Sequence, residues 1–149
     1  DSLGLDTVLL LFVLVPMAVH RLVEADPYPR DYNSTVARNV AEQVRDARPP
    51  LAGPLPNLDA YDTILLGSPI WNVQPPMIMR TFTDAVDLTG KAVYPFTTHA
   101  MSGLGRALAF YRDAAPAARI GEGLAIRGEE AIRARPVVAT WLRSIGLLV

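Results

Sequence analysis

Short apolar runs of strand length alternate with segments of helical periodicity along most of the chain. Continuous apolar runs are typical of parallel strands that are covered on both faces. The expected strands are Thr7–Phe12, Arg21–Ala25, Tyr61–Gly67, Ala92–Phe96 and Gly123–Gly128. Because a proline cannot donate a hydrogen bond to a neighbouring strand, Pro95 is expected near the end of its strand.

Between these runs, apolar residues recur every three or four positions, which predicts amphipathic helices. Asn33 or Ser34 is the expected cap of the first helix. Pro75 or Pro76 is expected to begin the second helix and Pro136 the last one, because a proline is well tolerated at a helix start. The expected apolar stripes are Val36, Val40 and Val44; Ile78, Phe82, Ala85 and Val86; Ala107, Leu108 and Tyr111; and Val137, Val138, Trp141, Leu142 and Ile145.

The alternation of strands and helices predicts an α/β fold with a parallel sheet. A chain of 149 residues is expected to form a single domain, residues 1–149. The loops Ser68–Gln74 and Thr97–Gly105 follow successive strands, so they should lie side by side on one rim of the sheet. Ligands of open parallel sheets bind at that rim. Trp71 is therefore placed where a ligand is expected, with core packing as its alternative role.

Composition and charge exclude several classes of function. Hydrophobic residues make up 50% and charged residues 19% of the chain, with a net charge of -1, which argues against disorder and against a nucleic-acid-binding surface. The absence of cysteine excludes disulfides, thiol catalysis and cysteine-ligated metals, and two histidines cannot form a histidine-rich metal site. The apolar stretch Thr7–Val19 is shorter than the ~20 residues of a membrane-spanning helix, so a buried strand is favoured there. We expect a cytoplasmic protein.

Four stretches, in chain order, resemble the flavodoxin-like family, and more closely its branch of short-chain single-domain flavodoxins. This resemblance implies a three-layer sandwich with a five-stranded parallel sheet in the order 2-1-3-4-5, and FMN bound on the rim. The stretches are DPYPRDYNSTVARNVAEQ (Asp26–Gln43), YDTILLGSPIWNVQPPMIMRTF (Tyr61–Phe82), DLTGKAVYPFTTHAMSGLG (Asp87–Gly105) and EGLAIRG (Glu122–Gly128).

The same resemblance implies which residues contact the flavin ring. The first wall of the site would be Pro69, Ile70, Trp71 and Asn72, and the second wall Thr98, His99, Ser102 and Gly103. An aromatic face stacked on the ring would contribute ~0.5–1.5 kcal/mol beyond its buried area. Backbone amides of the second loop could hydrogen-bond the ring and tune its electronics. No residue is assigned a catalytic or a metal-binding role, and His99 is not taken as a proton donor.

The chain departs from the family where the FMN phosphate is expected to bind. A flavodoxin carries a loop of the type S/T-x-T-G-N-T after its first strand, where the backbone amides of a helix N-terminus hold the phosphate. No Ser, Thr, Gly or Asn occurs between Phe12 and Arg21. Only eight residues, Val13–His20, separate the first two expected strands, whereas a parallel crossover needs about ten to twelve.

Three interpretations of this first unit are open. Residues can be missing from the sequence, the first strand and helix can be rebuilt as a hairpin or a single helix, or an altered helix can remain with misplaced strand boundaries. We favour omission or deletion of a loop and helix. Thr7–Arg21 is thus expected to lack an ordinary strand–loop–helix crossover. A chain without the phosphate loop is expected to hold FMN weakly, and its structure is expected to contain none.

Three functions are compatible with these patterns. The first is an FMN-binding redox protein that passes electrons to a partner protein or to a small-molecule acceptor. The second is an FMN-dependent reductase of small molecules such as quinones, with a nicotinamide donor and usually a dimer; the oligomeric state is open. The third is a flavodoxin-like scaffold without flavin. A net charge of -1 gives little electrostatic steering toward a basic partner, which weakens the first of them.

Overall fold

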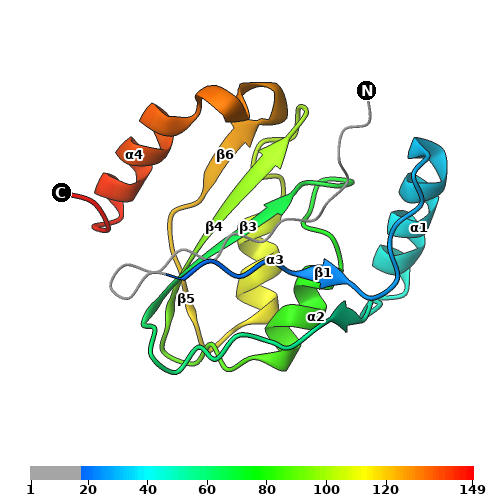
Figure 1. Cartoon of the computed structure of the whole chain (residues 1–149), viewed down its shortest axis with the longest axis horizontal. Coiled ribbons are helices and arrows are strands. Elements are labelled where there is room, and N and C mark those ends of the chain that lie inside the picture. Colours follow the sequence, from blue (N-terminus) through cyan, green and yellow to red (C-terminus); the bar gives the residue numbers. More distant parts are fainter. Residues whose placement is uncertain (1–17) are drawn as a thin grey trace.

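The main sheet of the protein is parallel and is built around one central strand (Figure 1). The structure is a computed structural model and describes residues 18–149. Strand β4 (Ala92–His99) pairs in parallel with β3 (Thr63–Pro69) on one side, and with β5 (Arg119–Ile120) and then β6 (Leu124–Arg127) on the other. The predicted α/β class with a parallel sheet is confirmed.

Helices cover both faces of this sheet. Helices α2 (Ile78–Ala85) and α3 (Ala107–Ala114) cover one face, where alternate strand residues meet them in the main core. On the other face, Trp141 of α4 (Arg135–Ser144) contacts Phe96 edge to face with ring centroids 6.1 Å apart. Trp141 is buried, as predicted, and so are Ala107 and Tyr111. The core includes Ile64, Leu66, Ile78, Met79, Phe82, Val93, Ala107, Phe110 and Tyr111.

Pro95 lies in the middle of β4, and the expectation that it ends the strand is wrong. The carbonyl of Val93 accepts from Gly121 N–H at 2.8 Å, so the backbone polar groups of Val93 point to the β5–β6 side of β4. The backbone of Pro95, two residues further, points to the same side because hydrogen-bonding directions alternate along a strand. Strand β5 has ended there at Ile120 and β6 begins only at Leu124. The missing N–H of the proline therefore falls at a gap in the hydrogen-bonding pattern.

The N-terminal part of the described chain forms a separate two-stranded sheet. Strand β1 (Val23–Glu24) pairs antiparallel with β2 (Leu51–Ala52), and Ala25 N–H donates to Pro50 at 2.9 Å. Only Val23 and Glu24 of the strand predicted at 21–25 are paired. Strand β2 lies in a segment that was predicted to be a connection. Residues 1–17, which include the expected first strand and most of the expected unusual crossover, lie outside the described residues. The order 2-1-3-4-5 stays a prediction.

Helix α1 (Tyr32–Val44) buries a polar face instead of the apolar face that its periodicity suggested. Its buried residues are polar, namely Thr35, Asn39 and Glu42. The valine stripe is exposed: Val36 is 41%, Val40 39% and Val44 81% accessible. Figure 1 shows α1 at the side, apart from the main sheet, so within residues 18–149 the stripe does not pack on β3–β6. The inner face instead makes hydrogen bonds, for example from the Thr35 hydroxyl to the Pro29 carbonyl at 2.7 Å.

Asp31 caps helix α1, and not Asn33 or Ser34 as predicted. Its extended backbone (φ -84°, ψ 143°) lets its carboxylate accept from the Ser34 N–H at 2.8 Å. That hydrogen bond holds the pKa of the Asp31 carboxyl below its usual value. A lowered pKa means that the cap stabilises the fold above the unfolded-state value. The contribution is lost as pH falls through the lower folded-state pKa.

The variant Asp31→Ala is expected to melt at a lower temperature than the parent chain at pH 7, because one N-terminal amide of α1 loses its partner. The difference should shrink as pH falls below the folded-state pKa of Asp31, because the parent carboxylate then becomes protonated as well. Thermal unfolding followed by circular dichroism measures both. Asn33→Ala is the control and should leave the melting temperature unchanged. An unchanged difference at low pH would contradict a charged cap.

Several element boundaries differ from those predicted by a few residues. Helix α2 begins at Ile78, after both prolines. The backbone pairing of β3 continues through Ser68 and Pro69, and that of β4 through Thr97–His99, although these residues were predicted to be loop. A short 3-10 helix, Gly128–Arg133, follows β6. Over residues 18–149, none of the helices has the length and apolar character that crossing a membrane requires.

Candidate functional site

Trp71 lies in a tight turn directly after the end of β3. Trp71 N–H donates to the Gln74 carbonyl at 2.9 Å, and Gln74 N–H donates back at 3.4 Å. Between them, Asn72 and Val73 have φ values of 48° and 63°. Two successive positive φ values are typical of a type I′ turn. The indole is half-buried at the rim of the sheet, so the predicted position of Trp71 outside the sheet core is confirmed.

The second predicted wall is a compact loop between β4 and α3. The hydroxyl of Thr97, buried at the end of the strand, donates to the Gly103 carbonyl at 3.1 Å. Gly105 N–H donates to the Ser102 carbonyl at 2.9 Å. Gly103 and Gly105 adopt φ values of 60° and 51°, in the left-handed region that glycine enters at little cost. These contacts fix the loop against the end of its own strand.

The two walls are in direct contact, as their positions after neighbouring strands predicted. Ile70 N–H donates to the Thr98 carbonyl at 3.0 Å, and Arg106 N–H donates to the Val73 carbonyl at 2.7 Å. A Cβ on Gly105 would lie 2.3 Å from the Val73 carbonyl oxygen, so only glycine allows this approach. The structure therefore brings the predicted site residues onto one rim.

The side chains of these residues differ in what they offer to a ligand. Asn72 is turned toward α1, where its amide donates to Gln43 Oε1 at 2.7 Å. His99 has a buried Nδ1 atom without a hydrogen-bond partner. A buried polar atom without a partner is costly, and ligand-binding positions are one setting where it is found. Thr98 and Ser102 are exposed and free to contact a bound molecule.

Sequence reasoning missed the residues that hold Trp71 in place. The Tyr28 ring meets the Trp71 ring edge to face, with centroids 5.1 Å apart and planes at 81°. The Tyr28 hydroxyl donates to the buried carboxylate of Glu42. Arg38 Nε donates to the same carboxylate at 2.8 Å, and the guanidinium lies 4.1 Å from the Tyr28 ring centroid. We call Tyr28, Arg38 and Glu42 the Trp71 brace.

A second link joins α1 to the turn itself. Gln43 Nε2 donates to the Trp71 carbonyl at 3.0 Å, while Gln43 Oε1 accepts from Asn72.

Burial, and then the hydrogen bond to Glu42, raise the pKa of the Tyr28 hydroxyl far above its usual range. Tyr28 therefore stays protonated and keeps donating to Glu42. The one sequence signal for this brace is the spacing of Arg38 and Glu42, which places both on one face of a helix.

Val73 is expected to be strained, because a β-branched side chain disfavours positive φ. Its φ of 63° implies a cost of ~1–2 kcal/mol. A glycine at this position would remove the strain, but its greater conformational freedom in the unfolded state would cancel part of the gain. We expect Val73→Gly to raise the free energy of unfolding by about 0.5–1 kcal/mol in a urea titration. Val137→Gly is the control, because Val137 is exposed on α4 although it was predicted to face inward, and it should lower the free energy of unfolding by a few tenths of a kcal/mol. Equal destabilisation by both variants would contradict strain at Val73.

The chain is similar to known proteins in both sequence and fold. The family described as flavodoxin matches residues 18–145. A crystal structure of a candidate flavoprotein from Bacteroides uniformis is 30% identical, with a TM-score of 0.71 over 82% of this chain and 78% of that one. One from Bacteroides eggerthii is 31% identical, with a TM-score of 0.66 over 83% and 77%.

A more distant structure shares the fold alone. The Lactobacillus acidophilus flavoprotein, in complex with FMN, is 19% identical, with a TM-score of 0.59 over 74% of each chain. No protein among those with curated descriptions matches significantly. The family match covers nearly the whole described chain, and the Bacteroides structures align with most of it. The chain belongs to the flavodoxin family.

Proposed function

We propose that the protein binds a flavin, FMN, on the rim between the Trp71 turn and the loop after β4, and that it acts as a redox protein. One observation carries the proposal: Trp71 is held at the end of a parallel strand, beside a glycine loop that touches the same turn. The end of a strand in an open parallel sheet is a typical ligand site. The Lactobacillus acidophilus flavoprotein of the same fold is a complex with FMN, which supports the choice of flavin.

The residues of the rim fit the ring of a flavin. Trp71 offers a large, half-buried aromatic side chain next to Pro69 and Ile70. The exposed hydroxyls of Thr98 and Ser102 offer hydrogen bonds for the ring heteroatoms. Gly103, with its positive φ, allows close backbone approach from the second wall. These residues would hold the ring between an aromatic wall and a polar one.

The phosphate of FMN is less well provided for. The stretch from Phe12 to Arg21 holds none of the Ser, Thr, Gly or Asn residues that form the phosphate loop of the family. Without that loop, most of the binding energy would come from the ring. We therefore propose that the chain binds flavins with modest affinity and discriminates little between FMN and riboflavin.

Bound FMN would supply reversible uptake of one or two electrons. The protein's own residues would bind and orient the ring and limit access of water to it. The Trp71 brace would keep the indole in one orientation, because its tyrosine is fixed by two partners. A partner protein or a small-molecule acceptor would then take the electrons at the open edge of the rim. Reduction of quinones with a nicotinamide donor is the enzymatic version of this proposal.

A flavin-free scaffold is the second candidate, and one observation favours it: the missing phosphate-loop residues between Phe12 and Arg21. It differs sharply in its consequences. A scaffold would not change the spectrum or the potential of an added flavin. It would use the same rim for protein contacts or for nothing at all.

Reconstitution with FMN separates these possibilities. The chain is mixed with FMN without oxygen and is reduced first with NADH or NADPH and then with dithionite. A redox protein should shift the midpoint potential of the flavin from that of free FMN. Reduction by the nicotinamide at a rate well above that of free FMN would identify a reductase. An unchanged potential with saturating protein would overturn the redox proposal and favour the scaffold.

A further inference from the structure

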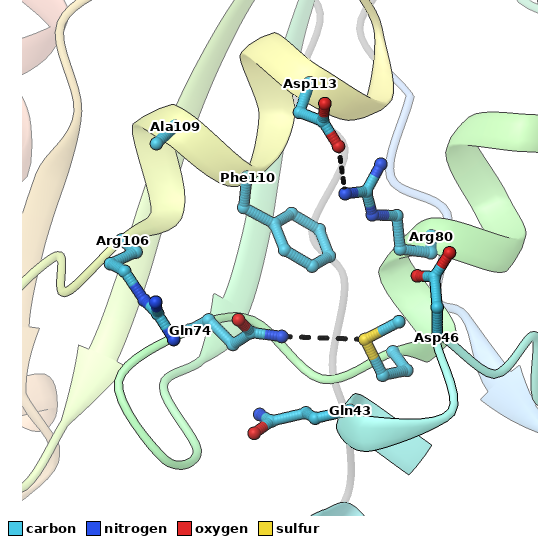
Figure 2. Close-up of a pocket in the computed structure, with 9 residues that line it drawn as sticks. Gln43, Asp46, Gln74, Arg80, Arg106, Ala109, Phe110 and Asp113 are labelled. Carbon is cyan, nitrogen blue, oxygen red and sulfur yellow. Dashed lines mark hydrogen bonds and ion pairs between the residues drawn. The ribbon is translucent and has the colours of Figure 1, made fainter.

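A hollow with a volume of about 320 Å³ lies next to the Trp71 turn, whose Gln74 lines it. Its walls come from the end of α1, the turn itself, α2 and α3 (Figure 2). This volume is at the lower end of the range of small-molecule sites, ~300–1,000 Å³. The predicted flavin contacts Pro69–Asn72 and Thr98–Gly103 are not among the residues that line it. The hollow is therefore distinct from the proposed flavin site.

The charges around the hollow leave one arginine uncompensated. Arg80 forms an ion pair with Asp113, and Asp46 forms one with Arg48 at 2.9 Å, which also lowers the pKa of Asp46. Arg106, at the start of α3, has no carboxylate partner among residues 18–149. Figure 2 shows Arg106 at one end of the hollow and the Arg80–Asp113 pair at the other. The two arginines and two aspartates that line the hollow balance in charge, but the Arg106 guanidinium has no carboxylate beside it in the described part of the chain and can pair with a carboxylate of a ligand.

One hydrogen-bond donor at the walls lacks a good acceptor. Gln74 Nε2 contacts only the sulfur of Met77 at 3.6 Å, and a thioether is a weak acceptor. A carboxylate supplies several acceptor sites and pairs well with a guanidinium, so it is the group that suits Arg106 best.

The middle of the hollow is apolar. The ring of Phe110 lies between the two charged ends in Figure 2, and the Arg80 guanidinium is 4.9 Å from the ring centroid. Ala109, which is exposed, adds apolar surface beside it, and the almost fully buried Met77 lies at the wall. A flat apolar body would contact these side chains, and a ring of Phe type prefers another aromatic ring as a neighbour.

We infer that this hollow is a second ligand site, which takes a small aromatic monocarboxylic acid with its carboxylate on Arg106 and its ring beside Phe110. Gln43 and Gln74, which line the hollow, also bond to the backbone of Trp71. The acid would therefore bind against the turn that carries the proposed flavin contact. The inference does not depend on flavin binding.

Benzoate and its uncharged counterpart benzamide are suitable probes, and no flavin is added. The full chain is labelled at its methionine methyl groups, and the Met77 methyl resonance is assigned by comparison with Met77→Leu. Benzoate should shift this resonance saturably, and benzamide should bind about tenfold more weakly or worse, because the charge-assisted contact is lost. Equal binding of the two probes, or no saturable shift, would overturn the inference.

Arg106→Gln and Arg112→Gln form a matched pair of variants on α3. Arg112 is exposed and does not line the hollow. Arg106→Gln should weaken benzoate binding about tenfold, Arg106→Lys should recover part of it, and Arg112→Gln should leave it unchanged. An unchanged resonance of the fully buried Met79 in Arg106→Gln shows that the variant is folded. Equal loss in both glutamine variants would also overturn the assignment.

Discussion

Replacing Trp71 with alanine is expected to weaken flavin binding by about 1–3 kcal/mol, the scale of an aromatic stacking contact removed by alanine. This corresponds to a rise in the dissociation constant of roughly 5–150-fold. The reason is the position of the indole, half-buried at the rim and adjacent to the second loop. Titration of the variant and the parent chain with riboflavin, followed by calorimetry, measures the effect.

Two further substitutions make this result specific. Trp71→Phe keeps an aromatic face and should recover much of the affinity. Trp141→Phe removes an indole that lies in the core on α4, and it should leave flavin affinity unchanged. If Trp71→Ala binds riboflavin as tightly as the parent chain does, Trp71 is not part of the flavin site.

The variant Arg38→Met is expected to lower the free energy of unfolding by about 3 kcal/mol, the lower end of the range for breaking a buried ion pair. The side chain of Glu42 is only 6% exposed, and Arg38 supplies its positive partner. Without Arg38, a carboxylate stays buried with the Tyr28 hydroxyl as its hydrogen-bond donor. Urea denaturation of the variant and the parent chain measures the loss.

Two controls separate a buried charge from a lost surface contact. The double variant Arg38→Met/Glu42→Gln should regain most of the stability, because an amide removes the charge and still accepts from Tyr28. Arg127→Met breaks an exposed pair with Glu129 at 3.5 Å and should change stability by less than ~1 kcal/mol. If Arg38→Met costs no more than Arg127→Met, the Trp71 brace does not contribute to stability.

The sheet could be predicted from sequence because its strands are apolar on both faces. The apolar residues of 61–67 and 92–96 mark the buried parts of β3 and β4. The polar C-terminal ends of these two strands could not be predicted in the same way. Backbone pairing continues through Ser68 and through Thr97–His99, where the side chains no longer indicate burial. The position of Pro95 in the middle of β4 is possible because of the gap between β5 and β6, and a single sequence does not show that gap.

Helix α1 was predicted as an element, but its orientation was not. The valine stripe indicated one inner face, whereas the structure buries Glu42 on another. That face is stabilised by Tyr28, fourteen residues earlier in the chain, so the contact depends on tertiary structure. The rim position of Trp71 could be predicted, since it follows from being directly after a strand. The brace that orients it could not.

Calorimetric titration of the chain with FMN and, separately, with riboflavin shows whether the rim between the Trp71 turn and the loop after β4 binds the flavin ring while the phosphate contributes little. Both flavins should bind saturably and with similar affinity. Failure of either flavin to bind would contradict the ring site. Tight FMN binding with clear discrimination against riboflavin would contradict the minor role of the phosphate.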